Sequence, residues 1–207
     1  MAATGELICE KSGVLNLGVE GRMLIGAVFG FAAVTVTGAP LLGVFAGALA
    51  GIFASLIFGF LTLSLLSNQV ATGLALTIFG TGLSALFGLE YVGNTIEQIE
   101  PIYIPVLTDL PIVGRILFGH DPLIYLAIGI LGLTAWFLRR TRAGMVLRAV
   151  GDSDYSAHAI GYPVIAIRYA AVAFGGAMAG LGGAYLSLAY TPLWAENMSA
   201  GRGWIAL

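Results

Sequence analysis

The chain has 207 residues, of which 58% are hydrophobic and 10% are charged, and its formal net charge is −2. A soluble domain carries roughly 25% charged residues, so this composition excludes an ordinary water-soluble protein and indicates an integral membrane protein. Strand-like alternation of apolar and polar residues is absent, which favours helices over a barrel. We therefore expect an all-α integral membrane protein, built as a multi-span helical bundle.

Five apolar segments predict the membrane helices, because about 20 apolar residues span the hydrocarbon core of a bilayer. They cover residues 23–37, 41–66, 70–89, 123–138 and 169–191. The first and fourth are short, and we expect each to extend into its flanks or to lie partly re-entrant. Residues 1–22 are mixed in character, and we expect them on the cytoplasmic side or dipping into the membrane from that side.

The charges predict the orientation, because cytoplasmic loops are enriched in Lys and Arg. Residues 139–168 hold five of the nine cationic residues and are predicted to be cytoplasmic, with Arg139, Arg140 and Arg142 acting as topology signals. Residues 90–122 carry five acidic residues against one arginine and are predicted to form an external loop. Four prolines favour extended or hairpin-like structure there. Its acidity is equally consistent with solvation and with a docking surface.

Small residues recur every four positions in two of the segments, which predicts closely packed helices. One series contains Ala39, Gly43, Gly47, Gly51, Ser55 and Gly59; the other contains Ala171, Gly175, Ala179, Gly183 and Ser187, beside Gly176 and Gly180. In lipid no hydrophobic force drives helices together, so close van der Waals contact must hold the bundle. We interpret both series as packing surfaces of a Gly/Ala-rich bundle rather than as parts of a substrate site.

The sequence contains none of the patterns that would indicate an enzyme. Cys9 is the single cysteine, His120 and His158 are isolated, and there is no P-loop motif. The clear apolar spans also lack charged residues, which argues against a proton relay or a charge-coupled carrier. We expect no enzymatic activity, no cofactor and no nucleic-acid partner, and we expect transport to be driven by another protein.

Two polar spots beside the apolar segments are candidate parts of a substrate pathway. Asn16 and Glu20 lie in a glycine-rich stretch that is either a re-entrant element beside the pathway or a juxtamembrane loop. Irregular backbone at membrane depth is tolerated only where it is buried in protein or lines a cavity. Asn68 and Gln69 lie between two segments with almost no linker, which favours a tight cytoplasmic turn over a helix break that exposes amides to a solute.

A short capped helix is predicted within residues 139–168. Residues 152–154 (Asp-Ser-Asp) supply N-cap side chains for a helix over about 155–160, and Gly161 is placed to end it. Pro163 prevents an immediate continuation as a helix interior. A short helix held between two membrane helices is suited to receive force from a partner protein.

Several stretches of the chain resemble one family of transport proteins. Residues 148–164 (RAVGDSDYSAHAIGYPV) resemble the coupling loop of ABC importer permeases in the branched-chain amino acid, ribose and nucleoside group. Residues 12–27 (SGVLNLGVEGRMLIGA) resemble the early Gly-x-x-Asn-Leu-x-x-Glu-Gly motif of that group. Residues 68–88 and 196–207 are also similar to its simple-sugar and nucleoside branch. The blocks occur in the expected order over nearly the whole chain.

This resemblance implies a permease subunit that translocates a small polar solute, most readily a nucleoside or simple sugar, through a bacterial inner membrane that it crosses several times. It implies three kinds of protein partner: cytosolic ABC ATPase subunits that bind ATP, a second permease subunit of the same or another kind, and an external solute-binding protein. The implied coupling residues are Arg148, Gly151, Asp152, Tyr155, Ala157 and Gly161.

We expect residues 1–207 to form a single transmembrane permease domain that includes the 90–122 loop and the 139–168 coupling loop. Members of the group have further spans after the Gly-Arg-Gly-Trp motif and often another at the start, so we expect the domain to be incomplete at the C-terminus, and the resemblance allows the same at the N-terminus. Two other classes remain open: a secondary carrier or channel without ATPase partners, and a membrane scaffold without transport. Uptake that follows an ion gradient would favour the carrier.

Overall fold

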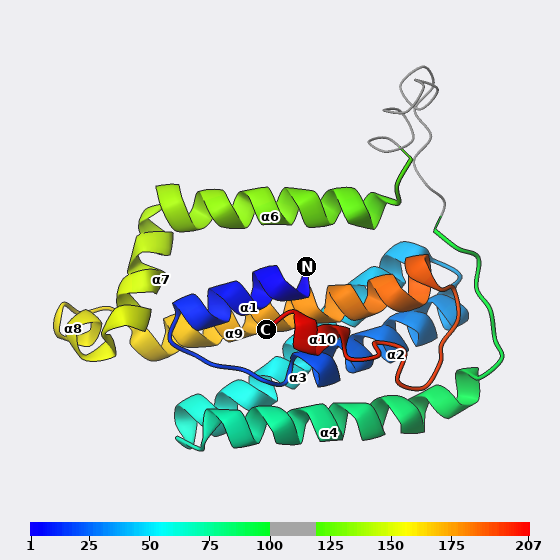
Figure 1. Cartoon of the computed structure of the whole chain (residues 1–207), viewed down its shortest axis with the longest axis horizontal. Helices are drawn as coiled ribbons and strands as arrows, with labels where there is room; N and C mark the ends of the chain where they lie inside the picture. The colour runs from blue at the N-terminus through cyan, green and yellow to red at the C-terminus, as the bar shows by residue number, and fades with distance from the viewer. Residues whose placement is uncertain (100–118) are drawn as a thin grey trace.

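The structure, a computed structural model, describes residues 1–99 and 119–207 (Figure 1). Within these ranges the chain forms helices and no β-strand. Five helical segments are long and apolar enough to cross a membrane, which agrees with an all-α, multi-pass membrane protein. They are α2 (Val19–Thr37), α3 (Pro40–Gly59, continuing as a π-helical turn to Ser64), α4 (Gln69–Gly88, continuing as a 3₁₀ turn to Tyr91), α6 (Pro122–Arg140) and α9 (Val164–Tyr185, continuing as a π-helical turn to Tyr190).

The five predicted apolar segments correspond to these five helices. The two short ones extend into their flanks, because α2 and α6 each reach 19 residues. The prediction that the clear spans lack charged residues concerned the second, third and fifth segments. The first span begins earlier than predicted, and the first turn of α2 includes Glu20 and Arg22. Sequence reasoning began this span at residue 23 because the preceding charges lower its hydropathy, although protein rather than lipid surrounds them.

Four shorter helices complete the described structure: α1 (Ala2–Lys11), α7 (Arg142–Asp152), α8 (Asp154–Ala159) and α10 (Arg202–Ile205). In Figure 1, α1 lies beside α9, on the side of the bundle that faces α6. Its inner residues, among them Glu6 and Cys9, are buried. Residues 1–22 are therefore part of the packed bundle rather than a free juxtamembrane loop.

The centre of the bundle is a close contact among α2, α3 and α9. A Cβ atom added to Gly26 of α2 would lie 2.5 Å from the Cα atom of Gly180, and one added to Gly51 of α3 would lie 2.9 Å from the same atom. Real side chains do not approach so closely, so larger residues would force these helices apart. Both predicted small-residue series lie at helix contacts, since the α3 series faces α9 and the α9 series faces α1, α2 and α3.

The outer helices differ in how firmly they are attached. α4 packs along α2 and the loop before it: Gly80 approaches Gly21 of α2, and Gly73 approaches Leu17 of the loop. α6 stands apart from α9 in Figure 1 and is held mainly at its end by α7. In its most apolar stretch only 17% of residues are buried, against 72% for α2.

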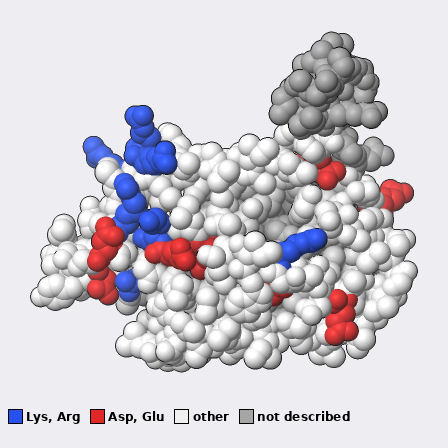
Figure 2. All heavy atoms as spheres, in the orientation of Figure 1, with Lys and Arg blue, Asp and Glu red and all other residues white. Residues whose placement is uncertain are grey.

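The ends of the bundle carry different charges. We call the end with α7 and α8 the α8 end; Figure 2 shows most of the visible Lys and Arg side chains gathered there, with acidic side chains among them. At the opposite end, residues 92–99 lie against the segment after α9, through a bridge between Thr95 and Leu193. The predicted extended structure between the prolines of the 90–122 loop falls mainly on residues 100–118, outside the described ranges.

Candidate functional site

The predicted capped helix is present as α8. Ser153 is its N-cap and accepts a hydrogen bond from the Ser156 N–H at 3.3 Å, and the helix ends before Gly161, whose φ of +96° favours glycine. Ala157 is buried and packs with Val150 and Val164, which holds one face of α8 against the bundle.

The opposite face of α8 is exposed. Tyr155 has 84% of its surface accessible and Ile160 has 76%, although both side chains are largely apolar. Arg148 and Asp152 are also exposed, on the neighbouring helix α7. The site therefore presents a small projecting surface with an aromatic and an aliphatic side chain.

Helix α7 joins α8 to the membrane helices and was not predicted from the sequence. Thr141 is its N-cap and accepts from the Gly144 N–H at 3.0 Å, while its hydroxyl donates to the Phe137 carbonyl of α6 at 2.7 Å. Leu147 and Val150 are buried. Val146, Leu147 and Val150 recur at helical spacing, and this apolar pattern predicts a helix even though arginines surround it.

Two contacts tie the α7–α8 pair to the loop that follows α1. Arg168, in the second turn of α9, lies 3.5 Å from the Asp154 carboxylate and donates from Nε to the Ser12 carbonyl at 3.1 Å. Gly151 is packed so closely on the Lys11 carbonyl that an added Cβ would clash with it. Sequence reasoning assigned Arg168 no role, since its partners lie 14 and 156 residues away.

The same loop contains Asn16, one of the predicted pathway residues. Asn16 is fully buried; its Oδ1 accepts from the Gly18 N–H at 2.9 Å and its backbone N–H donates to Glu6 at 3.2 Å. Its side-chain nitrogen has no hydrogen-bond partner among the described residues. Beside it, the Leu15 N–H donates to Gln69 Oε1 at 2.8 Å, which fixes the loop to the start of α4.

A buried ion pair lies below this loop. Arg22 Nη2 is 3.3 Å from Glu6 Oε2, and both side chains are at least 98% buried. Arg22 also donates to the Ser55 hydroxyl at 2.9 Å and to the Gly18 carbonyl at 3.2 Å, so the pair connects α1, α2 and α3. Burial raises the pKa of the Glu6 carboxyl, and the Arg22 guanidinium opposes this shift. Sequence reasoning missed this pair.

Glu20, the second predicted pathway residue, has a different set of partners. Its carboxylate accepts hydrogen bonds from the Ser199 hydroxyl and from the Gly201 and Gly203 N–H groups. It therefore holds the Gly-Arg-Gly-Trp turn against the start of α2. Glu20 and Asn16 occupy neighbouring turns but separate networks.

The remaining predicted pathway residues lie at the start of α4. Asn68 is the N-cap, and its side chain accepts from the Ala71 N–H at 3.0 Å. The connection before it is short, as predicted for a tight turn. A pathway role for Asn16, Glu20, Asn68 and Gln69 stays a prediction, and no cluster of metal-ligand side chains occurs in residues 1–99 or 119–207.

Comparison with known proteins gives a consistent result. Residues 1–207 match the family described as "Branched-chain amino acid transport system / permease component". The chain is 43% identical over its whole length to a putative glucose ABC transporter permease protein of Haloferax volcanii, of which it covers 64%. Over 98% of its length it is 33% identical to a nucleoside ABC transporter permease protein of Lactococcus lactis, of which it covers 68%.

A guanosine ABC transporter permease protein of Bacillus subtilis is 31% identical over 79% of the chain, which covers 55% of that relative. The chain thus spans roughly half to two thirds of the length of these relatives. No solved structure is significantly similar to it. Because the family match extends over all 207 residues, the chain belongs to the permease-component family of branched-chain amino acid transport systems.

Proposed function

We propose that this chain forms the membrane-spanning permease of an ATP-driven importer in a prokaryotic cell membrane, and that partner ATPases act on α8. The relatives are named as glucose, nucleoside and guanosine ABC transporter permeases, which supports a simple sugar or a nucleoside as the solute. The protein itself hydrolyses no ATP. A second permease subunit and an external solute-binding protein complete the proposed assembly.

The observation that carries the proposal is the surface of α8. Tyr155 and Ile160 project from a short helix whose other face is packed on the bundle. Exposed apolar side chains on a water-facing element are typical of protein-interaction sites, and aromatic residues often supply most of the binding free energy. An ATPase subunit that binds this surface and moves would therefore pull directly on α8.

The contacts around α8 give a route for that motion into the membrane. A shift of α8 displaces Asp154 relative to Arg168 and thereby the Ser12 loop. Gly151 transmits the same shift to the end of α1. The loop is hydrogen-bonded to Gln69 on α4, and through Asn16 to the Glu6 pair that joins α1, α2 and α3. Rigid-body movement of these helices would open a central path alternately to the two sides of the membrane.

The test is ATPase binding and ATP-driven uptake by the reconstituted transporter. Tyr155→Ala should weaken ATPase association about tenfold, because an interface anchor contributes about 1.4 kcal/mol or more. Asp152→Arg should do the same by placing a wrong charge beside the contact. Lys11→Gln is the control, since this exposed side chain lies at the same end but outside α7 and α8. Normal association and uptake in both test variants would refute the coupling role of α8.

A further inference from the structure

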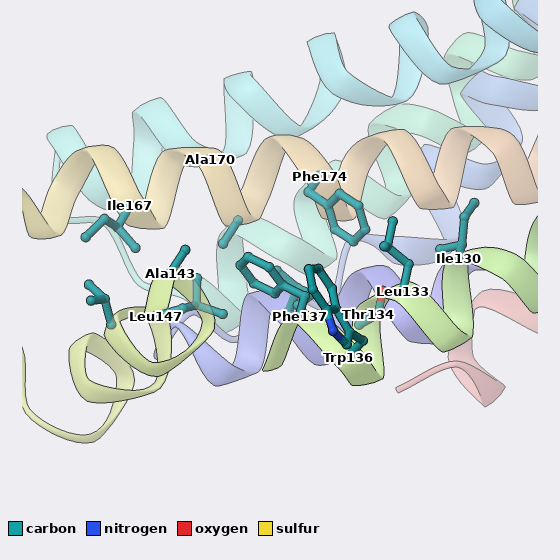
Figure 3. Close-up of a pocket in the computed structure, with 13 residues that line it drawn as sticks. Ile130, Leu133, Thr134, Trp136, Phe137, Ala143, Leu147, Ile167, Ala170 and Phe174 are labelled. Atoms are coloured by element: carbon teal, nitrogen blue, oxygen red, sulfur yellow. The ribbon is translucent and has the colours of Figure 1, made fainter. Parts of the chain in front are cut away.

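Hollows at the two ends of α6 differ in their chemistry. The one at the α8 end, between α6 and α9, is lined almost entirely by apolar side chains (Figure 3). The other lies at the start of α6 and has a volume of about 500 Å³, within the range of about 300–1,000 Å³ that is usual for ligand sites. Tyr185, Tyr190 and Arg202 supply its hydrogen-bonding side chains, and we call it the tyrosine pocket.

A π-helical turn places the two tyrosines together. In an α-helix, with 3.6 residues per turn, side chains five positions apart point in different directions. Here the Thr191 N–H donates to the Leu186 carbonyl, five residues back, at 2.9 Å, and the rings of Tyr185 and Tyr190 lie 6.4 Å apart between centroids. Single π-helical turns within α-helices are frequent at functional sites. The irregular end of α9 therefore builds an aromatic wall of the pocket.

Arg202 lies at this wall because its backbone is fixed on both sides. The N–H groups of Gly201 and Gly203 both donate to the Glu20 carboxylate. A Cβ atom added to Gly203 would clash with the Glu20 backbone, so the turn is closely packed on α2. The Arg202 guanidinium lies over the Tyr190 ring, 4.7 Å from its centroid, in a cation–π contact.

The polar groups of the pocket are available to a ligand. Within the part of the chain that the structure describes, Arg202 has no ion pair, and neither its guanidinium nor the hydroxyls of Tyr185 and Tyr190 form a hydrogen bond. Arg202 and Tyr190 are exposed, so a solute can reach them. A guanidinium only donates hydrogen bonds, whereas a phenol both donates and accepts. These groups suit a solute that carries acceptors and at least one donor.

We propose that the tyrosine pocket binds the base of a nucleoside during import. This inference rests on the proposed function and chooses between its two solute classes. A nucleobase has apolar faces, which pack on Tyr185 and Tyr190, and polar edges, which hydrogen-bond with Arg202 and the phenol hydroxyls. A simple sugar carries hydroxyl groups around its whole ring. The other lining side chains, among them Met23 and Leu123, are apolar and cannot replace the water that these hydroxyls would lose.

The position of the pocket fits an early step of import. Tyr190 is the last residue of the α9 span, and Leu123 is the second residue of α6, so the pocket lies toward the end of the bundle opposite α8. In the proposed assembly, an external binding protein delivers the solute at this end.

Direct binding tests the proposal without transport. The full chain in nanodiscs, without ATPases or a binding protein, is titrated with tritiated guanosine, glucose or guanosine monophosphate, and the bound ligand is measured by scintillation proximity. Guanosine should bind about tenfold more tightly than glucose, because only the base can stack on the tyrosine rings. The monophosphate should bind no more tightly than guanosine, since the pocket holds the base rather than a phosphate.

Substitutions separate stacking from hydrogen bonding. Tyr190→Leu should weaken guanosine binding about tenfold, whereas Tyr190→Phe, which keeps the ring, should weaken it by about threefold or less. Arg202→Gln should weaken it about fivefold through lost donors. Tyr162→Leu is the control and should leave binding unchanged, because it removes a tyrosine that is 39% exposed and lies outside the pocket. Far-UV circular dichroism checks that each variant is folded.

Three results would overturn the proposal. Absent guanosine binding, or equal binding of guanosine and glucose, would mean that the pocket selects no base. Equal losses in Tyr162→Leu and Tyr190→Leu would place the binding elsewhere, and tighter binding of the monophosphate would assign the pocket to an anionic solute. None of these results changes ATPase association. Failure of the proposed function, in contrast, would abolish ATPase association and leave guanosine binding intact.

Discussion

Arg22 is the largest fully buried side chain in the described structure, and its charge is balanced by a single carboxylate, Glu6. Removing two charges from water costs several kcal/mol per ion, and their attraction offsets this cost only when the remaining donors and acceptors are also satisfied. Here Ser55, Gly18 and the Asn16 N–H satisfy most of them. The pair is therefore a weak source of net stability but a strong source of specificity, because only one arrangement of α1, α2 and α3 completes it.

A double-mutant cycle tests this interpretation. Arg22→Met should cost about 3–5 kcal/mol of unfolding free energy, because it leaves the Glu6 charge buried and unpaired. Glu6→Gln in the same chain removes that charge and keeps an acceptor for Asn16, so the double variant should recover at least half of the loss. Unfolding in mixed micelles, followed by far-UV circular dichroism, measures both values. If the double variant were as unstable as Arg22→Met, the two charges would not compensate each other.

The burial of Cys9 gives a second expectation for a single side chain. Burial raises the pKa of its thiol to about 12, so at neutral pH it is protonated, and its Sγ also donates to the Ala171 carbonyl. Because the thiolate is the reactive form, a maleimide should label the folded protein negligibly over an hour at pH 7 and label it fully in denaturing detergent. Rapid labelling of the native protein would mean that α1 detaches readily from α9.

Some elements could be predicted from local sequence, and others could not. α8 was predictable because its cap residues and Gly161 act within a few positions of the helix they bound. The five spans were predictable because hydropathy is also a local property. The role of Arg22 and the hold of Glu20 on Gly201 depend on partners 16 and 181 residues away, and no pattern in one sequence records such pairings. Local signals therefore predicted α8 and the five spans, whereas the hydrogen-bond networks depend on tertiary contacts.

The packing of the central helices can be tested with two glycines in different surroundings. An added Cβ at Gly176 of α9 would meet Ser55 and Gly51 of α3, whereas one at Gly132 of α6 meets nothing within 4 Å. Gly176→Ala should lower the unfolding free energy by about 1–3 kcal/mol through overpacking. Gly132→Ala should raise it by about 0.5–1 kcal/mol, the ordinary gain in helix propensity. The same micelle titration measures both, and equal effects would contradict a close contact between α3 and α9.

The whole molecule consists of a rigid centre and two less firmly attached parts. α2, α3 and α9 form the centre through glycine contacts, α4 packs on α2, and α6 is held mainly at the α8 end. The loop of residues 12–18 contacts α4, α7 and α9 through side chains or backbone, and α8 reaches it through Arg168 of α9. In the proposed mechanism, a force on α8 would reach the loop through Arg168 of α9 and Gly151 of α7, and would reach α6 through α7.

Arg168 is the residue through which most of that force should pass, and its two contacts differ in strength. In the pair with Asp154, the Asp154 side chain is 60% exposed. Exposed ion pairs contribute only about 0–1 kcal/mol to stability. The charge-assisted bond to the Ser12 carbonyl is sheltered and contributes about 1.5–3 kcal/mol. Asp154→Asn should therefore reduce the amount of solute transported per ATP hydrolysed by less than about fivefold, whereas Arg168→Gln should reduce it about tenfold or more.

Both variants should still bind the ATPases, because neither change alters Tyr155 or Ile160. Uptake and ATP hydrolysis measured together in proteoliposomes distinguish a loss of coupling from a loss of binding. If Asp154→Asn impaired coupling as strongly as Arg168→Gln, α8 would act through the ion pair alone, and the loop would have no part in transmitting its motion.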